Sequence, residues 1–153
     1  ALAWLRLQPF NTGDRILSGP YWVLGLFALV WTTDIGAYAC GRLIGGPKIA
    51  PTISPNKTWA GLLGAMALTA LISYLLSRHI PDYPPLLAIT LGLLIAVVAQ
   101  AGDFLKSALK RRAGVKDSGT LLPGHGGLLD RIDGLLPASL FFALAVYLHL
   151  NFH

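Results

Sequence analysis

The residues best suited to chemistry lie in one segment, residues 102–133, which holds ten of the chain's 12 basic and 7 acidic residues. Asp130 and Asp133 are three positions apart, so a helical turn would point both carboxylates in the same direction. Paired oxygen ligands suit Mg²⁺, which binds one or two carboxylates together with substrate phosphates and water. A glycine-rich turn around His125 precedes them, and its backbone N–H groups can approach phosphate oxygens. The segment therefore predicts a site for a phosphate and a metal ion.

The start of the same segment favours a helix with one polar face. Asp103, Ser107 and Lys110 are spaced i, i+4 and i+7, which places a carboxylate, a hydroxyl and an ammonium together. His125 is interpreted as a phosphate contact or as a residue that orients its loop. The other histidines lie in distant parts of the chain, which disfavours a zinc site.

A second group of candidate residues lies upstream of this segment. Asp34 follows directly on an uncharged stretch; it either faces a polar interior or merely ends that stretch, and we favour the polar interior. Residues 54–58 are typical of a turn that leads into a helix, and Thr58 or Asn56 is suited to cap that helix. Lys57 is then expected near a helix N-terminus, where phosphate binds favourably.

Four windows without a charged residue predict the helices that position these groups, and they cover residues 16–33, 58–77, 83–102 and 134–153. A helix of about 20 apolar residues crosses the hydrocarbon core of a membrane. The chain is 54% hydrophobic and 12% charged with a mean hydropathy of +0.61, whereas a soluble domain carries about 25% charge. A single cysteine, Cys40, excludes a disulfide scaffold. We predict an all-α fold, a multi-pass transmembrane helical bundle of about four spanning helices.

The connections between the windows indicate an orientation. Two predicted spans separate residues 34–57 from residues 103–133, so both connections are expected on the same side of the membrane. Together they contain nine of the 12 Lys and Arg residues. The positive-inside rule makes that side cytoplasmic. The formal net charge of +5 predicts anionic partners, and the membrane context favours phosphate-bearing lipids or nucleotides over nucleic acid.

The order of these residues resembles the phosphatidate cytidylyltransferase family, also called CDP-diacylglycerol synthases. The family signature fits residues 107–133 without a gap, and residues 34–61 resemble its upstream D-x-G-A-Y, G-R and S-P-N-K-T-W-x-G pattern. The chain departs from the usual pattern at Ile35, Ala60 and Gly134. The matched signature residues are Ser107, Lys110, Arg111, Lys116, Asp117, Gly119, His125, Gly126, Gly127, Asp130, Arg131 and Asp133.

The resemblance implies transfer of CMP from CTP to phosphatidate, which gives CDP-diacylglycerol and pyrophosphate for phospholipid biosynthesis. It implies that residues 1–153 are the C-terminal catalytic membrane region of such an enzyme, and we expect further N-terminal helices outside this sequence. The implied location is the inner, cytoplasmic membrane, with the active site facing the cytoplasm. The implied partners are CTP, phosphatidate and membrane lipid, without nucleic acid; a homodimer is left open.

The resemblance also implies roles for individual residues. Asp103, Asp130 and Asp133 would hold Mg²⁺, and a second cation, with K⁺ as one candidate, would share this cluster. The expected catalytic residues are Asp103, Lys110, Asp117, Asp130 and Asp133. The expected substrate-binding residues are Asp34, Ser54, Asn56, Lys57, Ser107, Arg111, Lys116, His125, Gly126, Gly127 and Arg131.

Two other functions compete with this interpretation. A CTP-dependent polyprenol-type lipid kinase would release CDP rather than pyrophosphate. An ion-coupled membrane transporter would use the aspartates as an intramembrane ion site. Transporters of this kind commonly contain inverted repeats, and the sequence shows no internal repeat.

Overall fold

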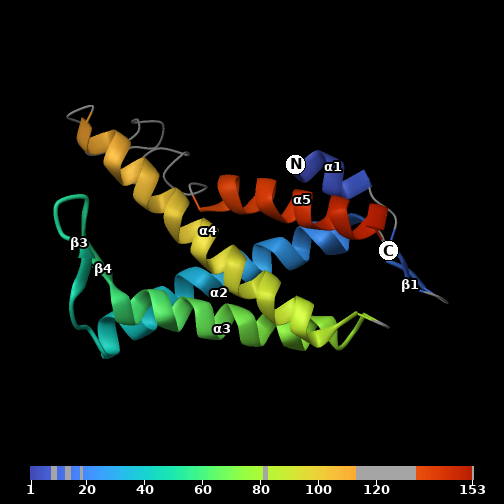
Figure 1. Ribbon diagram of the computed structural model, residues 1–153, viewed down its shortest axis with the longest axis horizontal. Helices are drawn as coiled ribbons and strands as arrows, with labels where there is room; N and C mark the ends of the chain where they lie inside the picture. Colours follow the sequence, from blue (N-terminus) through green and yellow to red (C-terminus); the bar gives the residue numbers. More distant parts are fainter. Residues whose placement is uncertain (8–9, 13–14, 18, 81–82, 113–133, 153) are drawn as a thin grey trace.

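The computed structural model describes residues 1–7, 10–12, 15–17, 19–80, 83–112 and 134–152 of the 153-residue chain. Figure 1 shows α2 and α3 side by side along the molecule, with α4 crossing them and α5 packed against α4 and α2. Two short hairpins, β1–β2 and β3–β4, lie at opposite ends. The elements in chain order are α1 (Leu2–Leu7), β1 (Phe10–Thr12), β2 (Arg15–Leu17), α2 (Gly19–Leu43), β3 (Lys48–Ala50), β4 (Ser54–Thr58), α3 (Trp59–Ser77), α4 (Pro85–Arg112) and α5 (Leu135–Phe152).

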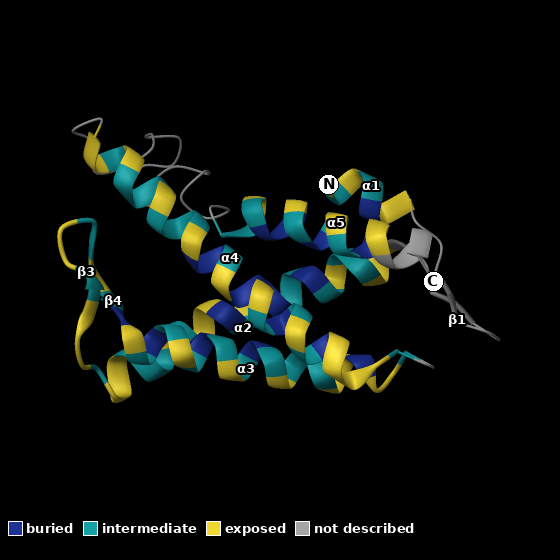
Figure 2. Ribbon diagram, in the orientation of Figure 1, coloured by how far each residue is buried: buried dark blue, intermediate teal, exposed yellow. Residues whose placement is uncertain are grey.

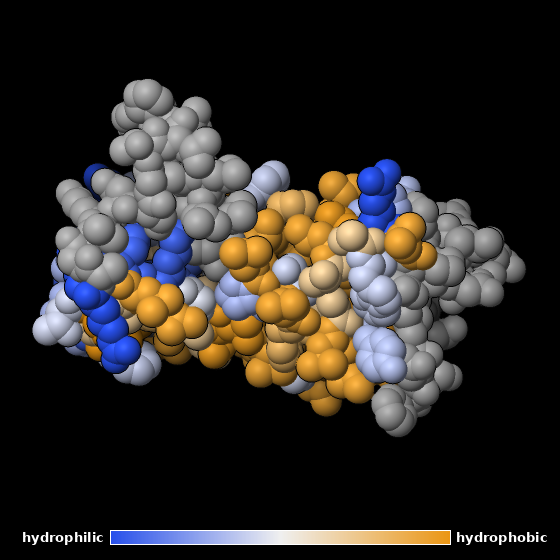
Figure 3. Space-filling model, turned by 90° about the horizontal axis from the view of Figure 1, so that it is seen from above, coloured by the Kyte–Doolittle hydropathy of each residue, from blue (hydrophilic) through white to orange (hydrophobic). Residues whose placement is uncertain are grey.

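Three of these helices are long and apolar enough to cross a membrane: Pro20–Leu43, Trp59–Ser77 and Pro85–Arg112. The fourth predicted window holds α5, whose described apolar stretch, Leu135–Leu148, is shorter. Figure 2 shows that the buried residues gather where α4 crosses α2, whereas outward helix faces are more exposed. Figure 3 shows an apolar band across the middle of one face, with hydrophilic residues gathered at the end that carries β3 and β4. The predicted all-α, multi-pass fold is confirmed.

Glycines allow α2 and α3 to pack closely. A Cβ atom built on Gly36 would lie 2.8 Å from the Gly64 carbonyl oxygen, and one on Gly61 would lie 2.9 Å from the Ala37 carbonyl oxygen. Deeper in the same interface, the hydroxyl oxygens of Thr33 and Thr69 are 2.9 Å apart. Small residues at these positions therefore bring the two backbones together, as membrane helices commonly do.

α4 crosses α3 at a second close contact, centred on Gly92. A Cβ atom on Gly92 would lie 2.8 Å from both the Ser73 Cβ and the Thr69 carbonyl oxygen. The Ser73 hydroxyl donates to the Ala88 carbonyl oxygen at 2.7 Å, which ties the two helices at this crossing. Three residues later on α4, Ile95 belongs to a buried apolar cluster that also contains residues of α2 and α5. The crossing directs the C-terminal half of α4 toward the β3–β4 hairpin (Figure 1).

The turn predicted at residues 54–58 is wrong, because these residues form strand β4. β4 pairs antiparallel with β3, with Lys48 opposite Thr58 and Ala50 opposite Ser54, and the register is irregular between these pairs. Weak intrinsic strand preference is overridden here by backbone pairing with a neighbouring segment. The predicted cap is confirmed: the Thr58 hydroxyl accepts a hydrogen bond from the Gly61 N–H at 3.1 Å.

Candidate functional site

A pocket of about 280 Å³ lies where the β3–β4 hairpin, α2, α3 and α4 meet. This is the end of the molecule at which α2 ends, α3 begins and the C-terminal half of α4 extends past the hairpin (Figure 1). The pocket therefore contains residues of both segments, 34–57 and 103–133, that the sequence predicts on the same side of the membrane. Its lining residues are Asp34, Ala37, Tyr38, Ser54, Asn56, Lys57, Thr58, Gly61, Leu62, Gln100 and Asp103.

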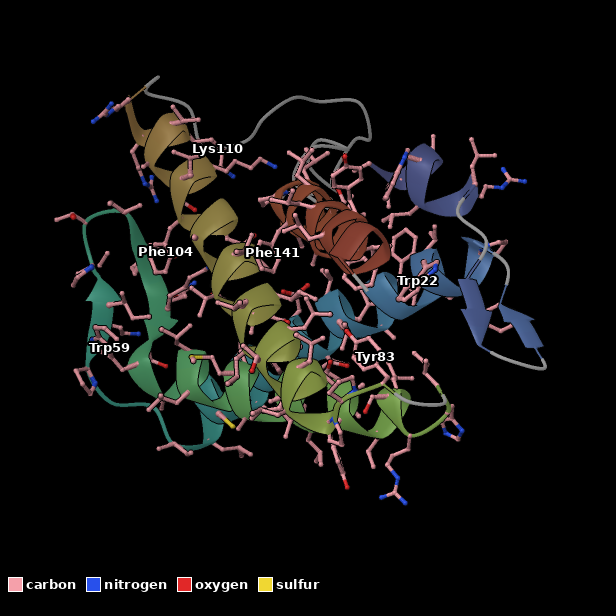
Figure 4. The ribbon with its side chains drawn as sticks, turned by 45° about the vertical axis from the view of Figure 1, so that its right-hand side comes forward. Trp22, Trp59, Tyr83, Phe104, Lys110 and Phe141 are labelled. Carbon is pink, nitrogen blue, oxygen red and sulfur yellow. The ribbon has the colours of Figure 1, made fainter. Side chains whose placement is uncertain are left out.

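An ion pair between β4 and α4 forms one wall of the pocket. The Lys57 Nζ donates to Asp103 Oδ2 at 2.8 Å, and each side chain is 21% exposed. The same ammonium lies 4.7 Å from the centre of the Phe104 ring, in a cation–π contact. Figure 4 shows Phe104 on the side of α4 that faces the hairpin. A positive and a negative charge thus meet in a half-buried position, where solvent screens them less than on an open surface.

Asp34 lies within α2 rather than at its end, because the helix continues to Leu43. Asp34 lines the pocket but is exposed rather than enclosed in a polar interior, and Tyr38 lines the same pocket one turn later. Arg42 follows at the next turn. It donates from Nη1 to the Tyr38 hydroxyl at 2.8 Å, with its guanidinium carbon 5.9 Å from the ring centre.

Gln100 is the residue of this pocket that the sequence analysis missed. It lies three positions before Asp103 on α4 and is only 6% exposed. The sequence carried a signal, because Gln100 interrupts the otherwise apolar second half of the uncharged window 83–102. Counting formal charges alone does not register a neutral amide.

The structure brings together five of the predicted site residues: Asp34, Ser54, Asn56, Lys57 and Asp103 all line the pocket. The predicted helical face of α4 is confirmed as far as Arg112, but the three predicted residues after Asp103 lie beyond the described lining of the pocket. These three are Ser107, Lys110 and Arg111; Figure 4 shows Lys110 extending from this part of α4. The other predicted residues lie outside the described residues: Lys116, Asp117, His125, Gly126, Gly127, Asp130, Arg131 and Asp133.

Gly134 shows where the chain is placed immediately after residue 133. A Cβ atom on Gly134 would lie 3.2 Å from Asp103 Oδ1 and 3.6 Å from the Ala99 carbonyl oxygen. Glycine therefore allows a close approach to Asp103 at this position. The described chain thus returns beside Asp103 as α5 begins.

The described pocket offers oxygen ligands of the kind that Mg²⁺ prefers. Two carboxylates, Asp34 and Asp103, line it together with the hydroxyl of Ser54 and the amides of Asn56 and Gln100. Within the residues that the structure describes, no three His, Cys, Asp or Glu side chains cluster as a metal site. The described part alone therefore supplies a fitting but partial donor set.

Comparison with known proteins identifies relatives over most of the chain. The profile of the cytidylyltransferase family matches residues 2–149. A phosphatidate cytidylyltransferase of Brucella suis biovar 1 (strain 1330) is 51% identical over 118 residues, which cover 76% of this chain and 43% of the relative. A phosphatidate cytidylyltransferase of Mycobacterium tuberculosis (strain H37Rv) is 38% identical over 122 residues, which cover 80% of this chain and 37% of the relative.

A third relative is described only as the uncharacterized protein YnbB of Escherichia coli (strain K12). It is 42% identical over 146 residues, which cover 95% of this chain and 48% of the relative. The chain thus spans less than half the length of each of these three relatives.

Proposed function

Because the chain belongs to the cytidylyltransferase family, we propose that it forms part of an enzyme that transfers CMP from CTP to phosphatidate. The observation that carries this proposal is the pocket in which Lys57 and Asp103 meet at one end of three apolar helices. A lipid phosphate and a water-soluble nucleotide can meet only at such a boundary between apolar and charged surfaces. The relatives named phosphatidate cytidylyltransferase supply the substrate pair.

The proposed reaction asks for positioning and charge neutralisation. A phosphate oxygen of phosphatidate attacks the α-phosphorus of CTP, a new P–O bond forms, and the bond to the β-phosphate breaks. Pyrophosphate leaves with the electron pair. The attacking oxygen is already ionised at neutral pH, so orientation contributes more than a general base does. Lys57, with its ammonium in the pocket, is the described residue best placed to bind the lipid phosphate, together with Ser54 and Asn56.

We propose that Mg²⁺ binds at Asp103 together with Asp130 and Asp133. The donor chemistry of the pocket fits this ion, since the carboxylates of Asp103 and Asp34 lie in it beside neutral oxygen donors. When bound, Mg²⁺ neutralises charge on the triphosphate and the leaving pyrophosphate. A second cation, with K⁺ as one candidate, belongs to the same proposal.

The remaining signature residues are assigned by their charge. Cations offset the negative charge of the triphosphate, and Asp117 is proposed as a further catalytic residue. Asp34, Ser107, His125, Gly126 and Gly127 are proposed to contact substrate. The proposed cations are Lys110, Arg111, Lys116 and Arg131.

The apolar helices make this a membrane protein. We further propose that it lies in the inner membrane with the pocket on the cytoplasmic side. Nine of the 12 basic residues fall within residues 34–57 and 103–133 of the sequence, and Lys57 and Asp103 of these two segments meet at the pocket, which supports that orientation. Cytoplasmic CTP then reaches the pocket directly, while phosphatidate reaches it from the bilayer.

The experiment uses the intact protein in lipid nanodiscs with labelled CTP, phosphatidate and Mg²⁺, and it measures pyrophosphate, CDP and CDP-lipid separately. The proposal expects equal amounts of pyrophosphate and CDP-lipid. Release of CDP with a phosphorylated lipid would identify the polyprenol-type kinase instead. Absence of all three products would overturn the assignment, while an Asp103→Asn variant serves as the inactive control.

A further inference from the structure

The Gln100 side chain is an exception among the buried polar side chains of the described residues. Six others, on α2, β4, α3 and α5, each make a hydrogen bond. Gln100 is 6% exposed and lines the pocket, yet its amide makes no hydrogen bond within the described part of the chain. The six others are Thr33, Thr58, Thr69, Ser73, Ser77 and Ser139.

An amide in this position is unfavourable for folding alone. It carries two N–H donors and one carbonyl acceptor, and burying most of the side chain without a protein partner for them costs free energy. The amide atoms face the pocket, so a molecule in the pocket is their partner, whereas an apolar side chain of the same length, such as methionine, would need none. Buried polar groups without partners therefore point to a ligand that supplies them.

The position of Gln100 along α4 indicates which part of a ligand reaches it. Gln100 precedes Asp103 by three residues, so it lies about 4.5 Å further toward the apolar middle of the helix. Lys57 and Asp103 carry the charges of the pocket, while Ala37 and Leu62 contribute apolar lining. The pocket lining thus includes a charged pair, a neutral amide and apolar side chains.

A glycerophospholipid carries the same three chemistries in order: an ionised phosphate, ester groups and hydrocarbon chains. With its phosphate at Lys57, its ester carbonyl oxygens lie on the apolar side of the charged pair. The triphosphate of CTP is charged and enters from water, so it gains nothing from an apolar depth. The order of chemistry along α4 therefore matches the lipid better than the nucleotide.

We propose that the Gln100 amide N–H donates a hydrogen bond to an ester carbonyl oxygen of phosphatidate and so selects ester-linked lipids. This inference rests on the proposed function and extends it to the linkage that the pocket recognises. Gln100 binds substrate in this proposal and takes no part in bond making or breaking.

The test compares dioleoyl phosphatidate with its diether analogue, which keeps the phosphate and the chains but lacks both carbonyl groups. Binding of each lipid without CTP, and KM and kcat with CTP, are measured for the intact wild-type protein and for Gln100→Met. The wild type is expected to prefer the ester lipid about fivefold, the factor that one net hydrogen bond supplies. Gln100→Met is expected to lose this preference while keeping KM for CTP and the Mg²⁺ requirement.

The melting temperature separates this role from a structural one. Gln100→Met removes an amide that has no described partner, so its melting temperature is expected to equal or exceed that of the wild type. Ser139→Ala is the matched control: it removes a buried hydroxyl of α5 that donates to the Leu136 carbonyl oxygen at 2.8 Å. It is expected to keep the ester preference.

An unchanged ester preference in Gln100→Met would overturn the inference, as would a change confined to KM for CTP or to Mg²⁺. A lower melting temperature with equal losses on both lipids would identify a structural residue and would also overturn it. A wild type that prefers the ester lipid in binding but forms no CDP-lipid would overturn the proposed reaction and leave the inference standing.

Discussion

We predict that substitutions in the ion pair between Lys57 and Asp103 affect the stability and the activity of the protein differently. Lys57→Met removes the ammonium and leaves the Asp103 carboxylate half-buried beside Phe104. Asp103→Asn removes the opposite charge and leaves the ammonium without its counter-ion. The double variant removes both charges. The distance of 2.8 Å and the 21% exposure of each side chain set the expected magnitude.

Exposed ion pairs stabilise proteins by about 0.2–1 kcal/mol, whereas breaking a buried pair from one side costs about 3–5 kcal/mol. This pair lies between those cases. Lys57→Met also loses the cation–π contact at 4.7 Å, which contributes about 0.5–1 kcal/mol at such sites. We expect each single variant to lower the free energy of unfolding by about 2 kcal/mol, which is about 4–8 °C in melting temperature.

The assay is thermal unfolding of the intact protein in one detergent for the wild type, both single variants and the double variant. The double variant is expected to recover most of the lost stability and to lie within about 1 kcal/mol of the wild type, because neither charge is then left alone, so the coupling energy should be about 3 kcal/mol. Its cytidylyltransferase activity should not recover, since the proposed reaction uses both charges. Arg78→Met, which removes an exposed cation stacked on Tyr74 at the other end of the molecule, is the control and should stay within about 0.5 kcal/mol. Stability losses that simply add in the double variant would refute this reasoning.

Three further predictions follow from the packing and the signature. Gly64→Ala places a Cβ atom against the neighbouring helix and should lower the free energy of unfolding, measured by chemical denaturation, by about 1–3 kcal/mol. Gly25→Ala is the control, because its added atom meets nothing within 4 Å, and it should leave the free energy of unfolding unchanged. Thr58→Ala removes the cap of α3 and should cost about 1 kcal/mol, while Thr58→Ser should retain the stability, and equal melting temperatures for both variants would contradict the cap. Asp130→Asn and Asp133→Asn should each abolish turnover without changing the melting temperature; near wild-type rates in both would contradict the proposed Mg²⁺ role.

Much of the fold could be predicted because the membrane imposes a simple pattern on the sequence. The uncharged windows located the apolar helices, whereas the close contact of Gly61 and Gly64 with α2 became evident only in the structure. The windows underestimated α2, since the helix continues to Leu43 after its apolar part ends. The first charged residue therefore marks where the apolar stretch ends. The helix itself continues beyond that residue, because its backbone hydrogen bonds do not depend on the polarity of the side chains.

The β3–β4 hairpin could not be predicted because its strands are short and its stability comes from pairing. Ser54, Pro55 and Asn56 are poor strand formers, and only the partner strand overrides that preference. Two glycines with positive φ, Gly45 at 66° and Gly46 at 93°, turn the chain from α2 toward the hairpin.

The pairing of Lys57 with Asp103 joins residues 46 positions apart, and no local pattern encodes it. Parity along the chain placed both residues at one membrane face. The contact itself depends on how α4 crosses α3, which is determined by the packing of Gly92 against Ser73. Since Asp103 lies 11 residues beyond Gly92, about 16 Å along the helix, a small change in crossing angle would separate the two charges.

α4 also explains how one element can serve both substrates of the proposed reaction. It continues without a break from an apolar window into the basic segment that ends at Arg112. Gln100 and Asp103 lie about one turn apart on it, so the neutral amide and the carboxylate are separated by about 4.5 Å along the helix axis. Because the helix is continuous, the depth of the pocket in the membrane is set by the same backbone that carries the proposed metal ligand. A shift of α4 along its axis would therefore move the lipid contact and the metal contact together, and their separation would stay fixed.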